Sequence, residues 1–184
     1  MSSRLKDKVA IITGATSGIG YRTAEIFADE GARLLLAARR EDKGKALADK
    51  LGGDVHFVKT DVTKEEDIKA MINAAVDRWG RVDCLFNNAS SGSPGDPVDQ
   101  LSFEQFQTAM DLQAGSVFLG IKYAVAVMKQ NGGGSIINNA SIAGIGVGYG
   151  SMLYSAGKAA VIHMTRCLAI ELGEFRIRLN CISP

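Results

Sequence analysis

Residues 9–20 read VAIITGATSGIG, an apolar run followed by a turn with three glycines. The run predicts a buried strand, and a helical pattern of apolar residues begins at Ile19. Gly14 permits a tight turn, Gly18 lets backbone come close to a bound phosphate, and Gly20 lets the helix pack against the strand. The helix N-terminus offers free N–H groups and a positive dipole end to a pyrophosphate. The stretch predicts a dinucleotide-binding turn, with a plain strand-to-helix turn as the alternative.

The rest of the chain continues this alternation of strands and helices. Short apolar runs predict strands at 9–12, 33–38, 55–58, 82–86, 135–138 and 177–182. Helical patterns cover 19–30, 41–51, 63–79, 102–131 and 153–172, with Thr63 and Glu66 typical of a capping box. We expect core positions for Phe103, Phe106, Met110, Phe118, Ile121 and Val125. Continuous apolar strands are typical of a sheet buried on both faces. The pattern predicts an α/β fold, a three-layer doubly wound domain of Rossmann type with a mainly parallel sheet, over residues 1–184.

Composition excludes several classes of function. The 184 residues carry 21 Lys and Arg against 20 Asp and Glu, a net charge of +1, which argues against a nucleic-acid partner. No apolar run reaches the about 18 residues that a membrane span needs, and the polar start MSSRLKDKVA is no signal peptide. Three cysteines without a CxxC pair and two distant histidines argue against a metal site. They favour reduced, buried thiols in a cytoplasmic protein.

Two residues in the second half of the chain are suited to acid–base chemistry. Tyr154 and Lys158 stand at i and i+4, so they project from one face of a helix. A free phenol, with a pKa of about 10, is a poor base at neutral pH, but a nearby ammonium favours the phenolate. Ser141 opens a glycine-rich loop after the fifth strand, where its hydroxyl can hydrogen-bond a substrate oxygen. The alternative is a helix-surface Tyr and Lys with an incidental turn Ser.

Together these motifs resemble the short-chain dehydrogenase/reductase (SDR) family over the whole chain. The turn has the family's spacing Thr-Gly-x-x-x-Gly-x-Gly, Asn87-Asn88-Ala89 follows the fourth strand, and Ser141 precedes Tyr154-x-x-x-Lys158 by thirteen residues. The resemblance implies hydride transfer between NADP(H) or NAD(H) and a small-molecule secondary alcohol or ketone. It also implies that Ser141 orients the substrate, Tyr154 transfers the proton, and Lys158 also holds the nicotinamide ribose.

The resemblance implies a set of cofactor-binding residues at the ends of the strands. They are Gly14, Thr16, Ser17, Gly18, Ile19, Gly20, Arg39, Arg40, Asp61, Val62, Asn88, Ala89, Tyr154 and Lys158. Members of the family that use NAD present an acidic residue at the end of the second strand, where this chain has Ala38. Arg39 and Arg40 follow, and a guanidinium there can pair with a 2′-phosphate. NADP is the favoured cofactor and NAD the alternative.

Three departures from the family pattern qualify this interpretation. Asp111 stands where the family has an Asn in a water relay to the lysine, and Ser90 replaces a glycine. The family also continues past Ser183-Pro184 with a substrate-side segment and a seventh strand. We therefore expect six of seven strands, with strand 177–182 at a sheet edge. The full-length form is expected to be a homo-oligomer, a dimer or tetramer. The alternative function is a catalytically weak or inactive dinucleotide-binding protein with a regulatory or vestigial role.

Overall fold

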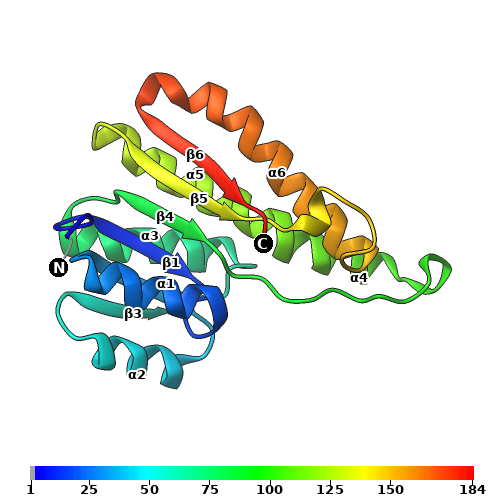
Figure 1. Cartoon of the computed structure of the whole chain (residues 1–184), viewed down its shortest axis with the longest axis horizontal. Coiled ribbons are helices and arrows are strands. Elements are labelled where there is room, and N and C mark those ends of the chain that lie inside the picture. Colours follow the sequence, from blue (N-terminus) through cyan, green and yellow to red (C-terminus); the bar gives the residue numbers. More distant parts are fainter. Residues whose placement is uncertain (1–2) are drawn as a thin grey trace.

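The computed structural model describes residues 3–184. Their strands form one parallel sheet in the order β3-β2-β1-β4-β5-β6, so the chain runs from the middle to one edge and then returns across β1 to the other (Figure 1). The strands are β1 (Val9–Thr13), β2 (Arg33–Ala38), β3 (Val55–Lys59), β4 (Cys84–Asn87), β5 (Gly134–Asn139) and β6 (Ile177–Ile182). The doubly wound Rossmann-type fold is confirmed, and β6 forms one edge of the sheet.

Helices cover the sheet on both faces. One face carries α1 (Gly18–Asp29) and α2 (Glu41–Leu51). The other face carries α3 (Glu65–Trp79), α5 (Ser116–Gln130) and α6 (Met152–Leu172), and α4 (Phe103–Met110) precedes α5. Short 3-10 turns are η1 (Val98–Gln100), η3 (Ile142–Gly144) and η4 (Gly173–Phe175). The single helix expected at 102–131 is divided by η2 (Asp111–Gly115), a turn of π-helix between α4 and α5.

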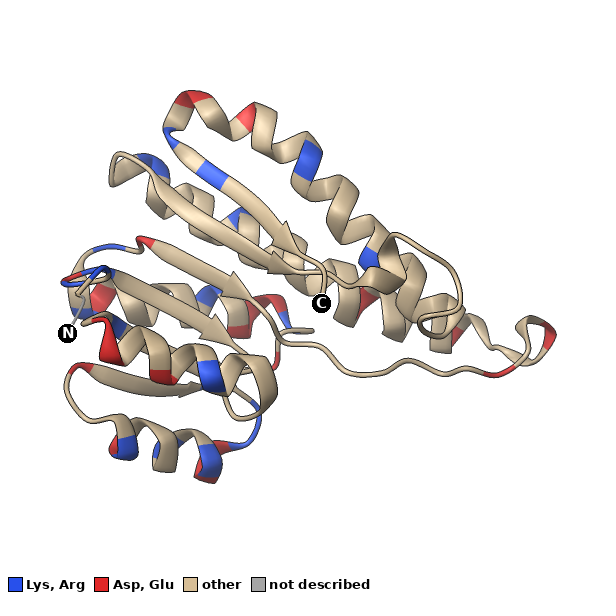
Figure 2. Ribbon diagram, in the orientation of Figure 1, with Lys and Arg blue, Asp and Glu red and all other residues tan. Residues whose placement is uncertain are grey.

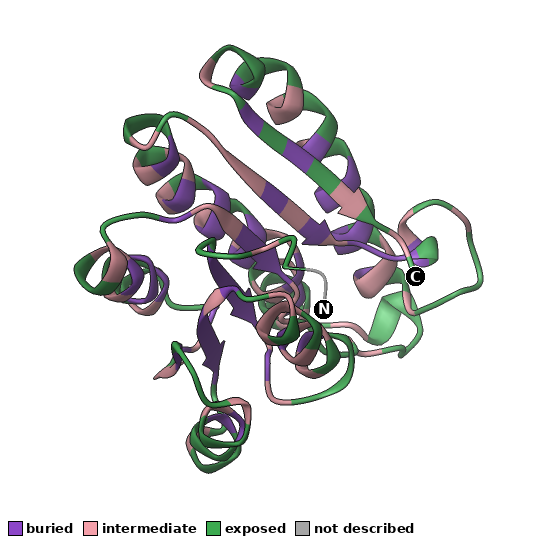
Figure 3. Ribbon diagram, turned by 60° about the vertical axis from the view of Figure 1, so that its left-hand side comes forward, coloured by how far each residue is buried: buried purple, intermediate pink, exposed green. Residues whose placement is uncertain are grey.

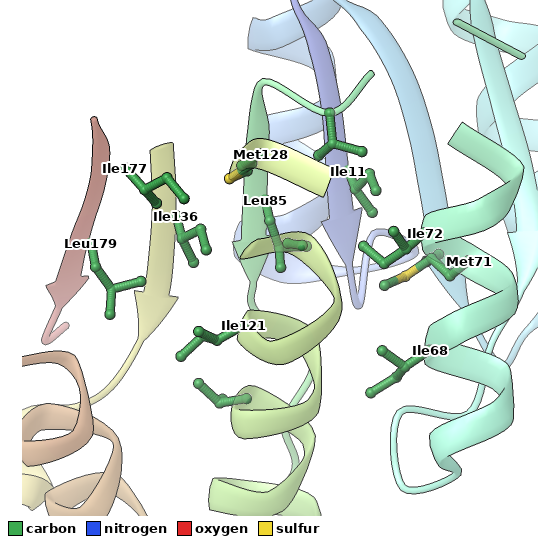
Figure 4. Packing of buried hydrophobic residues seen from close by; sticks show 14 of the residues in the cluster. Ile11, Ile68, Met71, Ile72, Leu85, Ile121, Met128, Ile136, Ile177 and Leu179 are labelled. Atoms are coloured by element: carbon green, nitrogen blue, oxygen red, sulfur yellow. The ribbon is translucent and has the colours of Figure 1, made fainter. Parts of the chain in front are cut away.

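Two apolar cores lie between these layers, one on each face of the sheet. The larger joins alternate residues of the strands to α3, α5 and α6, and Figure 4 shows Ile11, Leu85 and Ile136 packed against Ile72 and Ile121. The smaller joins the opposite faces of β1 and β2 to α1 and α2. In Figure 3 the buried residues follow the centre of the sheet, while the outer faces of the helices are exposed. A sheet buried on both faces explains the continuous apolar strands of the sequence.

Helix ends follow the local sequence in most places. The Ser102 hydroxyl accepts from the Gln105 N–H at 3.1 Å, and the Gln105 side chain accepts from the Ser102 N–H at 2.7 Å, a capping box that starts α4. The capping box predicted at Thr63 is wrong. Helix α3 starts after Lys64, and the Thr63 hydroxyl donates to Asp61 Oδ1 at 2.8 Å instead.

Three aromatic side chains expected in the core lie at the surface. Phe103, Phe106 and Phe118 are 71%, 40% and 50% exposed, whereas Ile121 of the same stretch is buried. Phe103 and Phe106 stack on each other with ring centroids 5.7 Å apart. The apolar pattern of this stretch therefore serves two surfaces, the core and an exposed face. Of the three cysteines expected to be buried, Cys167 is exposed and Cys84 and Cys181 are partly buried, and all three are free thiols.

Charged residues of both signs occur along the helices (Figure 2), whereas β1, β4 and β5 contain none. Within residues 3–184, no helix is long and apolar enough to cross a membrane. The same part of the chain contains no group of three or more His, Cys, Asp or Glu side chains placed to hold a metal ion.

The packing of α5 on β4 yields a stability prediction. A Cβ at Gly120 would overlap Asn87 Oδ1, and the buried Asn87 side chain donates to Asn138 Oδ1 at 2.9 Å. We expect Gly120→Ala to lower the free energy of unfolding by about 1–3 kcal/mol in urea denaturation, because overpacking outweighs the about 1 kcal/mol of helix propensity gained.

Gly115→Ala is the matched control, since the nearest atoms to its Cβ are Met110 O at 3.7 Å and Asp111 Oδ1 at 4.0 Å. This substitution is expected to be neutral or stabilising by up to about 1 kcal/mol. Equal effects of the two substitutions would contradict the packing argument.

Candidate active site

The glycine turn between β1 and α1 lies at the edge of the sheet where all six strands end. Gly14 and Gly18 have φ values of +66° and +55°, in the left-handed region that favours glycine. A Cβ at Gly14 would lie 2.9 Å from Ala89 Cα, and one at Gly20 would lie 2.5 Å from both Asn88 Nδ2 and Gly14 O. At Gly18, in contrast, no described atom lies within 4 Å of a Cβ. The turn is packed from behind and open in front, as a phosphate cradle requires.

The Asn88 side chain fixes this turn from the neighbouring strand. Its Nδ2 donates to Thr13 O at 2.9 Å, and the Thr13 hydroxyl accepts from the N–H groups of Asn88 and Ala89 at 2.9 and 3.0 Å. Thr13 is 3% exposed and also donates to Phe86 O. These bonds hold the ends of β1 and β4 together behind the open face of the turn.

A cavity of about 680 Å³ extends from the turn across the ends of β2 and β3. Its volume is in the range of small-molecule sites, about 300–1,000 Å³. It is lined by ten of the residues predicted to bind the cofactor, namely Gly14, Thr16, Ser17, Ile19, Arg39, Arg40, Asp61, Val62, Asn88 and Ala89, together with Ala38, Thr60, Thr63, Ser90, Ser91, Thr108 and Leu112. A glycine cradle that opens on such a cavity fits a dinucleotide.

Three charged groups, those of Arg39, Arg40 and Asp61, line this cavity. The Arg40 guanidinium donates to the Thr16 hydroxyl at 2.9 Å and to the Ser17 hydroxyl at 2.7 Å, which places its charge beside the N-terminus of α1. Burial alone would raise the pKa of Asp61, but the hydroxyl and N–H of Thr63 and the charge of Arg39 lower it below its ordinary value. Asp61 is therefore a carboxylate at neutral pH, and Arg39 lies near it.

Ser141 follows the end of β5, and Tyr154 and Lys158 lie on the N-terminal half of α6. Ser141 Oγ accepts from the Ala143 N–H at 3.2 Å, so its own hydroxyl hydrogen stays available to a ligand. A Cβ at Gly144 would lie 2.6 Å from the carbonyl carbon of Lys158, so the turn after Ser141 packs directly on α6. Lys158 Nζ lies 5.5 Å from the centroid of the Tyr154 ring.

Tyr154 also lines a second hollow of about 410 Å³ in front of this group. Its other lining residues are Ser90, Ser91, Gly92, Ser93, Tyr149, Gly150 and Ser151. Ser151 joins the two walls, because its hydroxyl donates to Ser93 O at 3.2 Å and accepts from the Tyr154 N–H at 3.4 Å as the cap of α6. Tyr154 therefore borders an open space between two serine- and glycine-rich loops.

The Lys158 ammonium is buried without a carboxylate partner. Lys158 is 2% exposed, and its Nζ donates to the main-chain oxygen of Asn139 at 2.8 Å. No carboxylate among residues 3–184 lies within ion-pair distance of it. Burial lowers the pKa of Lys158 from its ordinary 10.5 to about 8.

The relay role of Asp111 stays a prediction, and the structure adds a second polar residue of the same turn. Asp111 is exposed on η2, and the buried polar residue of that turn is Gln113, which is 1% exposed. Gln113 accepts from the Ser90 hydroxyl at 2.7 Å and donates to Ser91 O at 2.6 Å. A Cβ at Gly157, the residue before Lys158, would overlap the Gln113 side chain.

Sequence reasoning missed Gln113, although a signal was present. Gln113 shares a helical stripe with Val117 and Ile121, which are buried, so it is a polar residue on an apolar face. Ser90 in place of a glycine belongs to the same feature, since its hydroxyl is the donor to Gln113. Thr108 and Leu112, which line the larger cavity, were also not predicted.

Comparisons with known proteins agree with this geometry. The family model described as short chain dehydrogenase matches residues 8–184. Tropinone reductase-like 1 from Erythroxylum coca is 40% identical over 184 residues, covering 98% of this chain and 68% of that protein. (+)-Borneol dehydrogenase 2 from Salvia officinalis is 37% identical over 184 residues, covering 98% of this chain and 65% of that protein. A crystal structure of a short chain dehydrogenase from Mycobacterium smegmatis has a TM-score of 0.93 at 35% identity, covering 99% of this chain and 78% of that one.

The buried ammonium gives a prediction for stability against pH. Because the pKa of Lys158 is about 8 in the folded state, below its ordinary 10.5, the unfolded chain binds more protons between these values. The cost of burying the charge is complete below pH 8 and disappears as pH rises toward 10.5. We expect Lys158→Met to raise the free energy of unfolding at pH 7 by about 1–3 kcal/mol, with the gap to the wild type closing at higher pH.

Urea denaturation at pH 7 and at pH 10 measures this difference. Lys43→Met, a substitution of an exposed lysine on α2, is the control and should change stability little at either pH. A Lys158→Met protein less stable than the wild type at pH 7 would contradict the assignment of a costly buried charge.

Proposed function

The chain belongs to the short-chain dehydrogenase family, and from that premise we propose that it interconverts a secondary alcohol and the matching ketone with NADP(H), using Ser141, Tyr154 and Lys158. Membership makes the protein an oxidoreductase of CH–OH groups that takes a small-molecule substrate and a nicotinamide cofactor. The observation that carries the proposal is the approach of the buried Lys158 ammonium to Tyr154 at the edge of a hollow.

Each of the three residues has a distinct part in the proposed reaction. In the oxidation, the Tyr154 phenolate takes the hydroxyl proton of the substrate, and in the reduction the Tyr154 phenol returns a proton to the carbonyl oxygen. The Lys158 ammonium favours the phenolate electrostatically. The Ser141 hydroxyl donates to the substrate oxygen and orients it. When bound, the nicotinamide supplies the acceptor or donor of the hydride.

The preference for NADP is supported by the residues at the end of β2. Ala38 has no side-chain acceptor for a ribose hydroxyl, and both Arg39 and Arg40 line the cavity beyond it. Two guanidinium groups at this place suit the charge of a 2′-phosphate. Arg40 already donates to Thr16 and Ser17, so it also stabilises the turn, while Arg39 is the freer candidate for reading the phosphate. NAD remains the alternative cofactor.

A homo-oligomer is proposed from the exposed face of α4 and α5. Phe103, Phe106 and Phe118 are aromatic, exposed and on consecutive helices. Large apolar side chains that gather at a surface are typical of a protein interface. A dimer or tetramer of this chain would bury them. A cytoplasmic location is proposed as well, and the three free cysteines support it, because thiols persist in reducing compartments.

Replacement of the phenol tests the proposed reaction. We expect Tyr154→Phe to lower kcat at least about 100-fold, since only the transferable proton is lost while the ring and its packing remain. NADP(H) binding, measured by fluorescence titration, should stay close to that of the wild type. Turnover is followed as NADPH absorbance over a panel of secondary alcohols and ketones.

The control for this experiment is Tyr21→Phe on α1, whose hydroxyl accepts from Lys50 at the surface. It should retain full activity. A Tyr154→Phe protein with more than a few per cent of wild-type turnover would refute the acid–base assignment. A wild type that binds NADP(H) but turns over no member of the panel would favour the alternative of a catalytically weak dinucleotide-binding protein.

A second prediction concerns the cofactor. Arg39→Ala is expected to raise the Kd of NADP(H) roughly 10- to 100-fold, because a charge-assisted contact with the 2′-phosphate is lost. The Kd of NAD(H) should change little. Calorimetric titration of both cofactors makes the comparison, and Arg22→Ala, on α1 and outside the lining of the cavity, is the control. An equal loss for both cofactors would show that Arg39 does not read the phosphate.

A further inference from the structure

Asn139, the last residue of β5, connects that strand to the glycine turn. Its side-chain Nδ2 donates to Asn88 Oδ1 at 2.9 Å. Asn88 in turn donates from its own Nδ2 to Thr13 O at 2.9 Å, with Gly14 O at 3.5 Å. One pair of carboxamides therefore links the end of β5, across β4, to the backbone from which the turn begins.

The main chain of the same residue holds the catalytic lysine. Asn139 O accepts from Lys158 Nζ at 2.8 Å. The ammonium is buried and has no carboxylate partner among the described residues, so this carbonyl is its polar support. Asn139 thus contacts the cofactor turn through its side chain and the lysine through its backbone.

The Asn139 carboxamide has a hydrogen-bond partner for its donor but not for its acceptor. Its Oδ1 is buried and has no hydrogen-bond partner within residues 3–184. A buried acceptor without a partner costs free energy, and a purely packing residue at a strand end would carry none. Asn138, the preceding residue, differs. Its side chain points to the other face of the sheet, accepts from Asn87 and donates to Thr165, each at 2.9 Å.

We propose that Asn139 is a positioning residue. Its side chain fixes the end of β5 to Asn88, so that the main-chain carbonyl of Asn139 holds the Lys158 ammonium at a fixed position relative to the glycine turn. The inference rests on the proposed function, because only there does Lys158 serve both proton transfer and the cofactor. In this proposal, Asn139 connects the cofactor-binding part of the site, at the glycine turn, to the catalytic part, at Lys158.

Asn139→Leu tests the proposal, since leucine keeps the size of the side chain and removes both polar ends. The titration of Lys158 is followed by NMR on protein labelled with ¹³C-lysine, with the resonance assigned from Lys158→Met. When the carbonyl no longer holds the ammonium firmly, the apparent pKa of Lys158 should fall by about 0.4–1 pH unit. The Kd of NADP(H) should rise about 3- to 10-fold, and kcat should fall with it.

Asn138→Leu is the matched control, being the same change one residue earlier on the opposite face. It should lower thermal stability, because two buried hydrogen bonds are lost, and leave the Lys158 titration unchanged. If Asn139→Leu does not fold, Asn139→Thr takes its place, since threonine suits a strand and has no amide donor for Asn88.

A folded Asn139 variant with the Lys158 titration and NADP(H) affinity of the wild type would overturn the proposal. The same Lys158 shift in Asn138→Leu would also overturn it, by showing a general effect of loosening β5. Both readouts are independent of turnover. A wild type that is inactive on every alcohol and ketone would therefore refute the proposed function while the titration still decides the role of Asn139.

Discussion

The site depends on a close contact that two glycines permit. Asn88 occupies the space that side chains at Gly14 and Gly20 would fill, and from there it donates to the backbone of β1. This contact sets the distance between the ends of β1 and β4 and the direction in which α1 begins. The helix N-terminus, the open face of Gly18 and the cavity beyond all follow from it. A larger residue at either glycine would push apart the two halves of the sheet.

Burial of a single ammonium organises the other half of the site. A charged group is hard to desolvate, so the protein must supply a support for it, and here that support is one main-chain oxygen at the end of β5. Burial lowers the pKa of Lys158 to about 8. Its place beside Tyr154 also limits where the neighbouring strand can end, because the carbonyl must point at the helix.

Much of this architecture follows from the sequence. The bounds of β2, α2 and β6 agree with the predicted ranges, because apolar runs and helical periods there are flanked by clear glycine or charged boundaries.

The roles assigned to Ser141, Tyr154 and Lys158, and the segment expected beyond Pro184, stay predictions. Asp111 was predicted because it stands where the family pattern has an Asn, and that comparison left out Gln113, the buried polar residue of the π-helical turn. The exposure of the three phenylalanines was not predicted either, because an apolar helical stripe does not show whether it packs on its own chain or on another copy. The link from Asn139 to Asn88 needs the register of β4 and β5, which pairs Asn87 with Asn138.

The central position of β1 has a consequence for how the chain is made. β1 is buried along its whole length and pairs with β2 on one side and with β4 on the other. Since β4 ends at Asn87, a growing polypeptide exposes one side of this apolar strand throughout the synthesis of α1, α2 and α3. Unpaired strand edges of this kind attract other chains. Until the fourth strand is made, one edge of β1 therefore has no strand of its own chain to pair with, and this edge is open to other chains.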